Sequence, residues 1–182
     1  MNADPPTGAT SSLRRTHRGL TLRQLLVEGE GSRTEIADRL GLSQMAASRI
    51  VRELIDAGLV EEAGLTNRGA GPGRCATSLR LRDQGAYAAG ITFSAYSTEV
   101  AIVGATGRVV AHKIVVLDGC DDGGAALDVL ADALVDLIDA CSIPRARLVG
   151  VGVVLAAHLD AARRRVVNAS YLGLEPFDVV EP

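Results

Sequence analysis

The spacing of apolar residues in the first part of the chain predicts a helix. Leucines separated by polar residues recur at positions that a helix brings to one face: Leu13, Leu20, Leu25 and Leu26. We therefore expect one amphipathic helix from Leu13 to about Glu28, closed by Gly29 and Gly31. Residues 1–11 are rich in Pro, Thr, Ser and Gly, and we expect a flexible tail because they hold too little apolar material to order themselves.

The next stretch has the residues that begin and end two further helices. Ser32 and Glu35 have capping-box spacing, in which each side chain accepts a hydrogen bond from the other residue's backbone N–H. Gly41 permits a tight turn, and Ser43 is a candidate N-cap for a longer helix that reaches about Ala57. A short helix, a turn of few residues and a longer helix are typical of a helix-turn-helix.

The longer helix has two distinct faces. Its apolar residues gather on one side, where they predict a buried stripe: Ala47, Ile50, Val51 and Leu54. Its other side gathers Met45, Ser48, Arg49 and Arg52. For an isolated helix a solvated arginine face is the commoner explanation. The capping box, the glycine turn and the basic loop that follows favour DNA recognition instead.

A two-stranded wing is predicted after this helix. Leu59–Glu62 and the alternating stretch Cys75–Arg82 read as strands, and the loop 63–74 between them holds four glycines and Pro72. Arg68 and Arg74 lie in this loop of small residues, which can approach phosphates or a minor groove closely. The loop lacks the Gly-Lys-Ser/Thr ending of a P-loop and joins strands, so it is not a nucleotide loop.

From Gln84 the pattern changes to short strands with a single helix. Three strands of an antiparallel meander are predicted, at residues 86–93, 98–104 and 108–117. Residues 121–141 have apolar positions at helical spacing, with aspartates on another face. Residues 148–155 predict a buried strand of the type found in the middle of α/β sheets. Beyond it we expect a hairpin within 156–167 and no packed closing element in 168–182.

Composition narrows the class of protein. The 182 residues are 47% hydrophobic and 23% charged, the balance of one large or two small globular domains. We expect a cytoplasmic protein, because no apolar run is long enough to cross a bilayer and the N-terminus does not resemble a signal peptide. Cys75, Cys120 and Cys141 have spacings that suit neither a disulfide framework nor a zinc site.

Charge is divided unevenly along the chain. Residues 1–82 hold 12 arginines and 9 acidic residues, a net charge of +3, whereas residues 83–182 have a net charge of −6. A basic front and an acidic back predict that only the front meets a polyanion.

With both halves laid out, the chain resembles the ROK family of repressors and sugar kinases. The stretches 32–43 and 48–60 are similar to that family's DNA-binding head, and Gly73-Arg-Cys-Ala76 is similar to its Gly-Arg-Pro-Ala wing exit. In the back half, Tyr87–Ile91 and Asn168–Gly173 are similar to parts of its actin-like domain. The resemblance implies an α+β protein of two domains: a winged helix-turn-helix at 12–82, then a partial actin-like, RNase H-like α/β domain at 83–182.

The departures from the family bear on activity. ROK kinases have an Asp-x-Gly-Gly-Thr loop after the first strand, and here that stretch is Thr92-Phe-Ser-Ala-Tyr96, without the Asp and the glycines. The family's Gly-x-Pro-Gly element is replaced by Val154–Asp160. Its catalytic Asp, sugar-contacting Glu-x-Gly-His element and zinc ligands belong beyond residue 182. The resemblance therefore implies a chain that is not an enzyme, with no catalytic residue, cofactor or metal.

The expected function is a DNA-binding transcriptional regulator, a repressor of truncated ROK type. The partners implied are double-stranded DNA and a second subunit, in a homodimer or in a hetero-oligomer with a related regulator; a sugar effector is left open. The alternatives are an interaction module that pairs with a full-length ROK protein and a remnant of a sugar kinase. The candidate DNA-binding residues are Ser32, Arg33, Ser43, Gln44, Met45, Ser48, Arg49, Arg52, Arg68 and Arg74.

Overall fold

The computed structural model describes residues 7–66, 76–94, 97–117, 122–160, 162, 164–169 and 172–179. The chain divides into two compact units, Met1–Gly85 (unit 1) and Ala86–Pro182 (unit 2). Residues 1–6 of the expected tail lie outside the described residues, as does the wing loop 67–75. In the part of the chain that the structure describes, no helix is long and apolar enough to span a bilayer.

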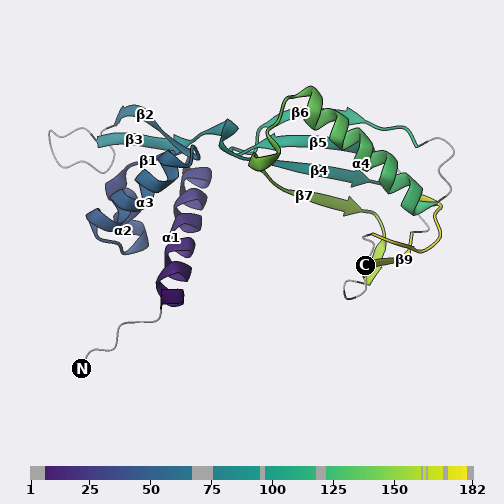
Figure 1. Ribbon diagram of the computed structural model, residues 1–182, viewed down its shortest axis with the longest axis horizontal. Helices are drawn as coiled ribbons and strands as arrows, with labels where there is room; N and C mark the ends of the chain where they lie inside the picture. The colour runs from purple at the N-terminus through teal and green to yellow at the C-terminus, as the bar shows by residue number, and fades with distance from the viewer. Residues whose placement is uncertain are drawn as a thin grey trace. The chain divides into compact units, whose positions relative to one another are not determined.

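Unit 1 contains three helices and a small sheet (Figure 1). Its elements are α1 (Thr7–Glu28), β1 (Glu30–Gly31), α2 (Arg33–Leu40), α3 (Gln44–Asp56), β2 (Val60–Thr66), β3 (Ala76–Leu81) and the 3-10 turn η1 (Asp83–Gly85). The strands lie in the order β1-β3-β2, with antiparallel pairing throughout. Helix-turn-helix and wing therefore occur in the order that the sequence predicts.

Two features of unit 1 differ from the prediction. The first helix begins at Thr7, not at Leu13, so part of the expected tail is helical. Extending a formed helix costs far less than starting one, so a polar end can continue from the amphipathic part. The second feature is β1, whose two residues pair with Arg80 and Leu79 of β3. Gly29, which ends α1 at φ 76°, sets up this unpredicted pairing.

The apolar stripes of the three helices meet in one core. Leu25 of α1, Ile36 of α2, Val51 of α3 and Leu79 of β3 are among its fully buried members. Burial of the predicted α3 stripe is complete or nearly so, at 0–4% exposure for all four residues. Since α3 is held through this stripe, its opposite face is left free.

Unit 2 is a four-stranded sheet with one helix on a face (Figure 1). Its main elements are β4 (Tyr87–Phe93), β5 (Thr98–Gly104), β6 (Val109–Ile114), α4 (Gly123–Ala140), the 3-10 turn η2 (Arg145–Arg147) and β7 (Leu148–Leu155). The order is β6-β5-β4-β7, in which β4 pairs parallel with β7 and the other pairs are antiparallel. Helix α4 packs on β4, β5 and β6.

Strand β7 lies at the edge of this sheet, which overturns the prediction of a buried central strand. It pairs with β4 on one side only, and its side chains Val149 and Val154 are 75% and 64% exposed. Even Val151 and Val153, which share the α4 side of the sheet with Ala89 and Ile91, are about half exposed. An apolar run predicts a strand but does not show what covers it. Strand β7 is exposed because α4 packs over the neighbouring strands instead.

The end of the chain is packed, against expectation. The predicted hairpin is present as β8 (His158–Asp160) and β9 (Arg165–Asn168), and β10 (Phe177–Asp178) pairs with β9. Phe177 is 6% exposed and contacts α4, where a Cβ added to Gly123 would lie 2.1 Å from its ring. A single aromatic residue therefore closes the end of the core that contains Val166, which is fully buried.

Candidate nucleic-acid interface

The turn between α2 and α3 is fixed by caps at both ends of α2. Ser32 Oγ accepts from the Glu35 backbone N–H at 3.2 Å, and Glu35 Oε2 accepts from the Ser32 N–H at 2.8 Å, so the predicted capping box is formed. Gly41 ends the helix in the left-handed region at φ 63°, a conformation that other L residues adopt only with strain. This geometry sets the angle at which the chain enters α3.

Helix α3 begins at an exposed cap. Ser43 Oγ accepts from the Ala46 N–H at 3.2 Å, while the side chain of Ser32 is fully buried. The two candidate serines therefore differ in what they offer to a ligand. Ser43 stands at an open helix start, where unpaired N–H groups attract anions, whereas the side chain and N–H of Ser32 are both occupied within the capping box.

The two caps should also differ in their effect on stability. We expect Ser32→Ala to lower the free energy of unfolding by about 1–2 kcal/mol, because it breaks a buried reciprocal cap. Ser43→Ala should cost roughly 0.5–1 kcal/mol, because water can replace its exposed hydroxyl. Urea unfolding followed by far-UV circular dichroism measures both. A larger loss for Ser43→Ala would contradict the assignment of Ser32 as the main cap.

The free face of α3 carries the predicted residues together. Gln44, Met45, Ser48, Arg49 and Arg52 are all exposed, and Met45 is 83% exposed. Ser48, Arg49 and Arg52 also line an open hollow of about 760 Å³, together with Arg33, Ile55 and Glu62.

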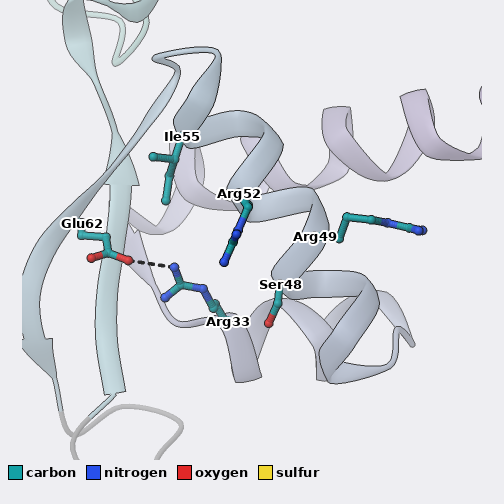
Figure 2. A pocket seen from close by; sticks show the side chains of 6 residues that line it. All are labelled: Arg33, Ser48, Arg49, Arg52, Ile55 and Glu62. Carbon is teal, nitrogen blue, oxygen red and sulfur yellow. Dashed lines mark hydrogen bonds and ion pairs between the residues drawn. The ribbon is translucent and has the colours of Figure 1, made fainter.

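Figure 2 shows how the arginines are arranged in this hollow. Arg33 at the start of α2 forms an ion pair with Glu62 of β2, with 2.8 Å between Nη2 and Oε1. Arg52 points toward this pair, and Arg49 points away from it. The Arg33–Glu62 pair ties α2 to the wing strand. Nothing in the sequence signalled this pair, since its partners are 29 residues apart.

Several arginines of unit 1 form ion pairs with carboxylates, but those on the exposed face of α3 do not. Glu61 accepts from Arg80 on β3 and from Arg82 just after it, and these arginines hold its pKa below the usual range. Arg39 pairs with Glu28, and Arg18 pairs with Glu53. Within the described residues, Arg49 and Arg52 are in no ion pair. The face of α3 therefore presents two guanidiniums whose charge no adjoining carboxylate cancels by direct contact.

The contact between α1 and α3 includes a charged pair with a pH signature. Arg18 donates to Glu53 through both Nε and Nη2, at 2.8 and 2.6 Å. This hydrogen bonding, helped by the charges of Arg18, Arg14 and Arg49, holds the pKa of Glu53 below its ordinary 4.5. The pair thus contributes stability that is fully present above pH 4.5 and is lost as the pH falls through the lower, folded-state pKa.

Arg18→Met should remove that stability. We expect the melting temperature of the variant to lie below that of the wild type at neutral pH, and the difference to shrink once the pH falls below 4.5. Thermal melts across a pH series measure this difference, with Arg23→Met as the control for loss of an exposed arginine on the same helix. A difference between wild type and Arg18→Met that did not change with pH would contradict the argument.

Two predicted site residues lie outside the described residues, namely Arg68 and Arg74 in the wing loop. The strands that lead into and out of this loop are described and paired up to Thr66 and Ala76. Strand β2 continues to Thr66, farther than expected, through a bulge between Glu62 and Leu65. Gly64, at φ +105°, gives the bulge the backbone freedom that it needs.

The end of β4 is the place in unit 2 where a phosphate-binding loop would follow. Strand β4 ends at Phe93, whose side chain is 4% exposed in the core, and just beyond it Ser94 Oγ donates to the Ser97 carbonyl at 2.9 Å. Residues 95 and 96 lie outside the described part. Among the described residues, no three His, Cys, Asp or Glu side chains gather closely enough to hold a metal ion.

Fold and surface together define the class of protein. Three helices and two wing strands give unit 1 the fold of a winged helix-turn-helix domain, with an exposed cationic face on the second helix of the helix-turn-helix. The winged helix-turn-helix DNA-binding family matches residues 17–61, in agreement.

The comparisons extend beyond the DNA-binding domain. The chain is similar to the crystal structure of a ROK family transcriptional regulator, a homologue of the E. coli MLC protein, with a TM-score of 0.65 and 18% identity over 91% of this chain. This similarity confirms the predicted two-domain α+β fold and its resemblance to the fold of a ROK regulator. The chain is also 30% identical, over 148 residues, to the uncharacterized protein y4fQ of Sinorhizobium fredii. It spans 41% of the solved chain and 36% of the curated relative.

Proposed function

We propose that this chain is a DNA-binding transcriptional regulator of the ROK type, that it acts as a repressor, and that it has no kinase activity. The single observation that carries the proposal is the face of α3, on which exposed Arg49 and Arg52 stand free of any ion pair among the described residues. The burial of the opposite face and the caps of α2 and α3 hold this surface in place.

The dimensions of α3 suit the major groove. A helix with its side chains is about 10–12 Å across, and the groove is about 12 Å wide. Arg49 and Arg52 are proposed to read base edges, since a guanidinium donates in pairs to guanine. Gln44, Met45 and Ser48 would lie beside them, with Ser43 at the phosphates. Arg33 is proposed to position α2 against the wing strand through its ion pair with Glu62. Arg68 and Arg74 are proposed to reach DNA from the wing.

Ser32 is not proposed to contact DNA directly. Its side chain is fully buried and both of its polar groups are engaged with Glu35. It acts by holding α2, and thereby the turn that aims α3.

Tight binding by one such head calls for a partner. A single winged helix buries a modest area on DNA, and twofold dimers bind the two halves of a palindrome. A homodimer or a hetero-oligomer with a related regulator is therefore part of the proposal, and repression follows when the bound protein occupies a promoter. The exposed valines of β7 favour a second candidate function, because an apolar strand edge can pair with another protein. The chain would then be an interaction module that pairs with a full-length relative.

The absence of kinase activity rests on the turn after β4. Nucleotide phosphates are bound by backbone N–H groups that approach closely, which glycines permit and bulky side chains prevent. The stretch Thr92–Tyr96, which begins with the last two residues of β4, contains no glycine, and the Phe93 ring is packed in the core. No carboxylate lies within Thr92–Tyr96 to orient a magnesium ion. Phosphoryl transfer from ATP to a hexose by the purified chain would overturn this part of the proposal.

The test of DNA binding is selection from a pool of random duplexes, followed by titration of the selected and unselected duplexes at several salt concentrations. We expect saturable binding with a preference for the selected sequence that survives moderate salt. Binding that falls steeply with salt and does not depend on sequence would contradict the hypothesis that this chain regulates transcription without a partner. Recovery of sequence preference only after a related full-length protein is added would support the interaction module instead.

A further inference from the structure

Helix α1 is positively charged, and two of its arginines share one side. Between Thr7 and Val27 the helix holds four arginines and not one acidic residue. Arg14 and Arg18 are one turn apart, so they lie on the same side of α1, about 6 Å apart along its axis. Arg14 is exposed and the Arg18 side chain is 43% exposed.

This surface adjoins the proposed DNA-reading helix through a defined contact. The fork of Arg18 is docked on Glu53 of α3. Glu53 lies one turn after Arg49, on the same side of α3. The charges of Arg14, Arg18 and Arg49 all act on the Glu53 carboxylate. Arg18 is thus in direct contact with this acid at the junction of α1 and α3, and the charges of Arg14 and Arg49 also reach it.

The charges in this junction do not balance. One carboxylate cannot neutralise three guanidiniums, so a net positive charge of about two remains at a surface open to water. Because Arg18 uses Nε and Nη2 on Glu53, the exposed Arg14 and Arg49 are the groups with donors to spare. An excess of donors and positive charge selects an anion with several oxygens.

The position of the junction indicates which anion this is. A helix seated in the major groove fills its width, so whatever packs against the side of that helix meets the sugar-phosphate wall of the groove. On one side of α3, Arg52 and Arg33 face the hollow toward the wing strand, and Arg49, which lines the same hollow, points away from the Arg33–Glu62 pair (Figure 2). The α1 junction occupies a second flank, joined to the reading face through Arg49.

We propose that Arg14 and Arg18 bind a backbone phosphate of the DNA at the wall of the groove that α3 enters, beside the end of the reading face that Arg49 occupies. This inference rests on the proposed function and adds a contact to it. The contact is independent of sequence, because phosphates carry no base identity. It adds affinity and fixes the register of α3, while Arg52 and the wing act on the other flank.

The chain offers a matched control for this contact. Arg23 is also exposed on α1, nine residues after Arg14, which is about two and a half turns and therefore the opposite side of the helix. Arg14→Gln and Arg23→Gln remove the same charge from the same helix. They differ in the side of α1 that loses the charge and in its position along the helix.

The probe is an unselected duplex of about 20 base pairs, two helical turns, titrated against the full chain at several salt concentrations. We expect Arg14→Gln to weaken binding about 3- to 10-fold near 0.1 M salt and to reduce the slope of log K against log salt by roughly 1. Arg23→Gln should change affinity less than about 2-fold, because an exposed charge beyond the Debye length is screened. Glu53→Gln should tighten binding, because it removes the one negative charge beside the phosphate.

The outcomes separate this inference from the proposed function. Equal effects of Arg14→Gln and Arg23→Gln, or no tightening by Glu53→Gln in a variant that still melts cooperatively, would overturn the phosphate site. If Arg49→Ala/Arg52→Ala nevertheless loses binding, the DNA-binding proposal is still supported. Failure of the wild type to bind any duplex would overturn both.

Discussion

Replacing Arg49 and Arg52 together by alanine is expected to abolish sequence-selective DNA binding. Both side chains are exposed on α3, and neither is in an ion pair within the described residues. Each bidentate arginine–guanine contact is worth about 1–3 kcal/mol of discrimination. Losing both should weaken binding to a selected duplex roughly 30-fold to 10⁴-fold, from the relation of about 1.4 kcal/mol to each factor of ten.

The informative quantity is the ratio of affinities for selected and unselected duplexes. In the double variant this ratio should approach one, because what remains is contact with phosphates. Arg23→Ala/Arg145→Ala is a control of equal charge: Arg23 is exposed on α1, and Arg145 pairs with Asp139 at 63% exposure of both side chains. An equal drop in the ratio for this control would assign the effect to net charge and contradict the role of α3.

The largest expected effect on stability concerns the contact between Phe177 and α4. Phe177→Ala should lower the free energy of unfolding of unit 2 by about 3–5 kcal/mol, since it empties a buried aromatic site. Gly123→Ala should cost roughly 1–3 kcal/mol, although alanine is the better helix former. The reason is that its Cβ would lie within 2.5 Å of three carbons of the Phe177 ring, which cannot bend aside.

A double-mutant cycle tests the contact itself. In the Phe177→Ala background the clash is gone, so Gly123→Ala should become nearly neutral or stabilising. Tyrosine fluorescence is the suitable signal, because the chain has no tryptophan and its three tyrosines all lie beyond residue 86. Additive costs in the double variant would mean that Gly123 and Phe177 act separately.

Local chemistry explains why the helix-turn-helix could be predicted from the sequence. Each capping residue acts on backbone groups only a few residues away, so the spacing alone identifies the caps that the structure contains. These residues are Ser32, Glu35, Gly41 and Ser43. The two faces of α3 follow from helical periodicity in the same way. Whether Arg49 and Arg52 bind DNA is not a matter of local chemistry, and it stays a prediction.

The features that the sequence did not reveal depend on distant partners. Phe177 is one aromatic residue in a polar stretch, and it is buried because α4 carries a glycine opposite it. Strand β7 reads as a buried strand, although which of its sides is covered depends on the position of α4. The Arg33–Glu62 and Arg18–Glu53 pairs likewise join positions 29 and 35 residues apart, beyond the reach of any local pattern.

The pairing of β4 with two unlike neighbours has a consequence for the order in which unit 2 folds. Its antiparallel pairs with β5 join residues 5 to 17 positions apart, from Phe93↔Thr98 to Tyr87↔Gly104. Its parallel pairs with β7 join residues about 60 apart, such as Tyr87↔Leu148. Closing the longer loop costs more chain entropy, and its contacts are made at the less covered edge. We therefore expect the meander to form in the folding nucleus and β7 to be the last strand to join.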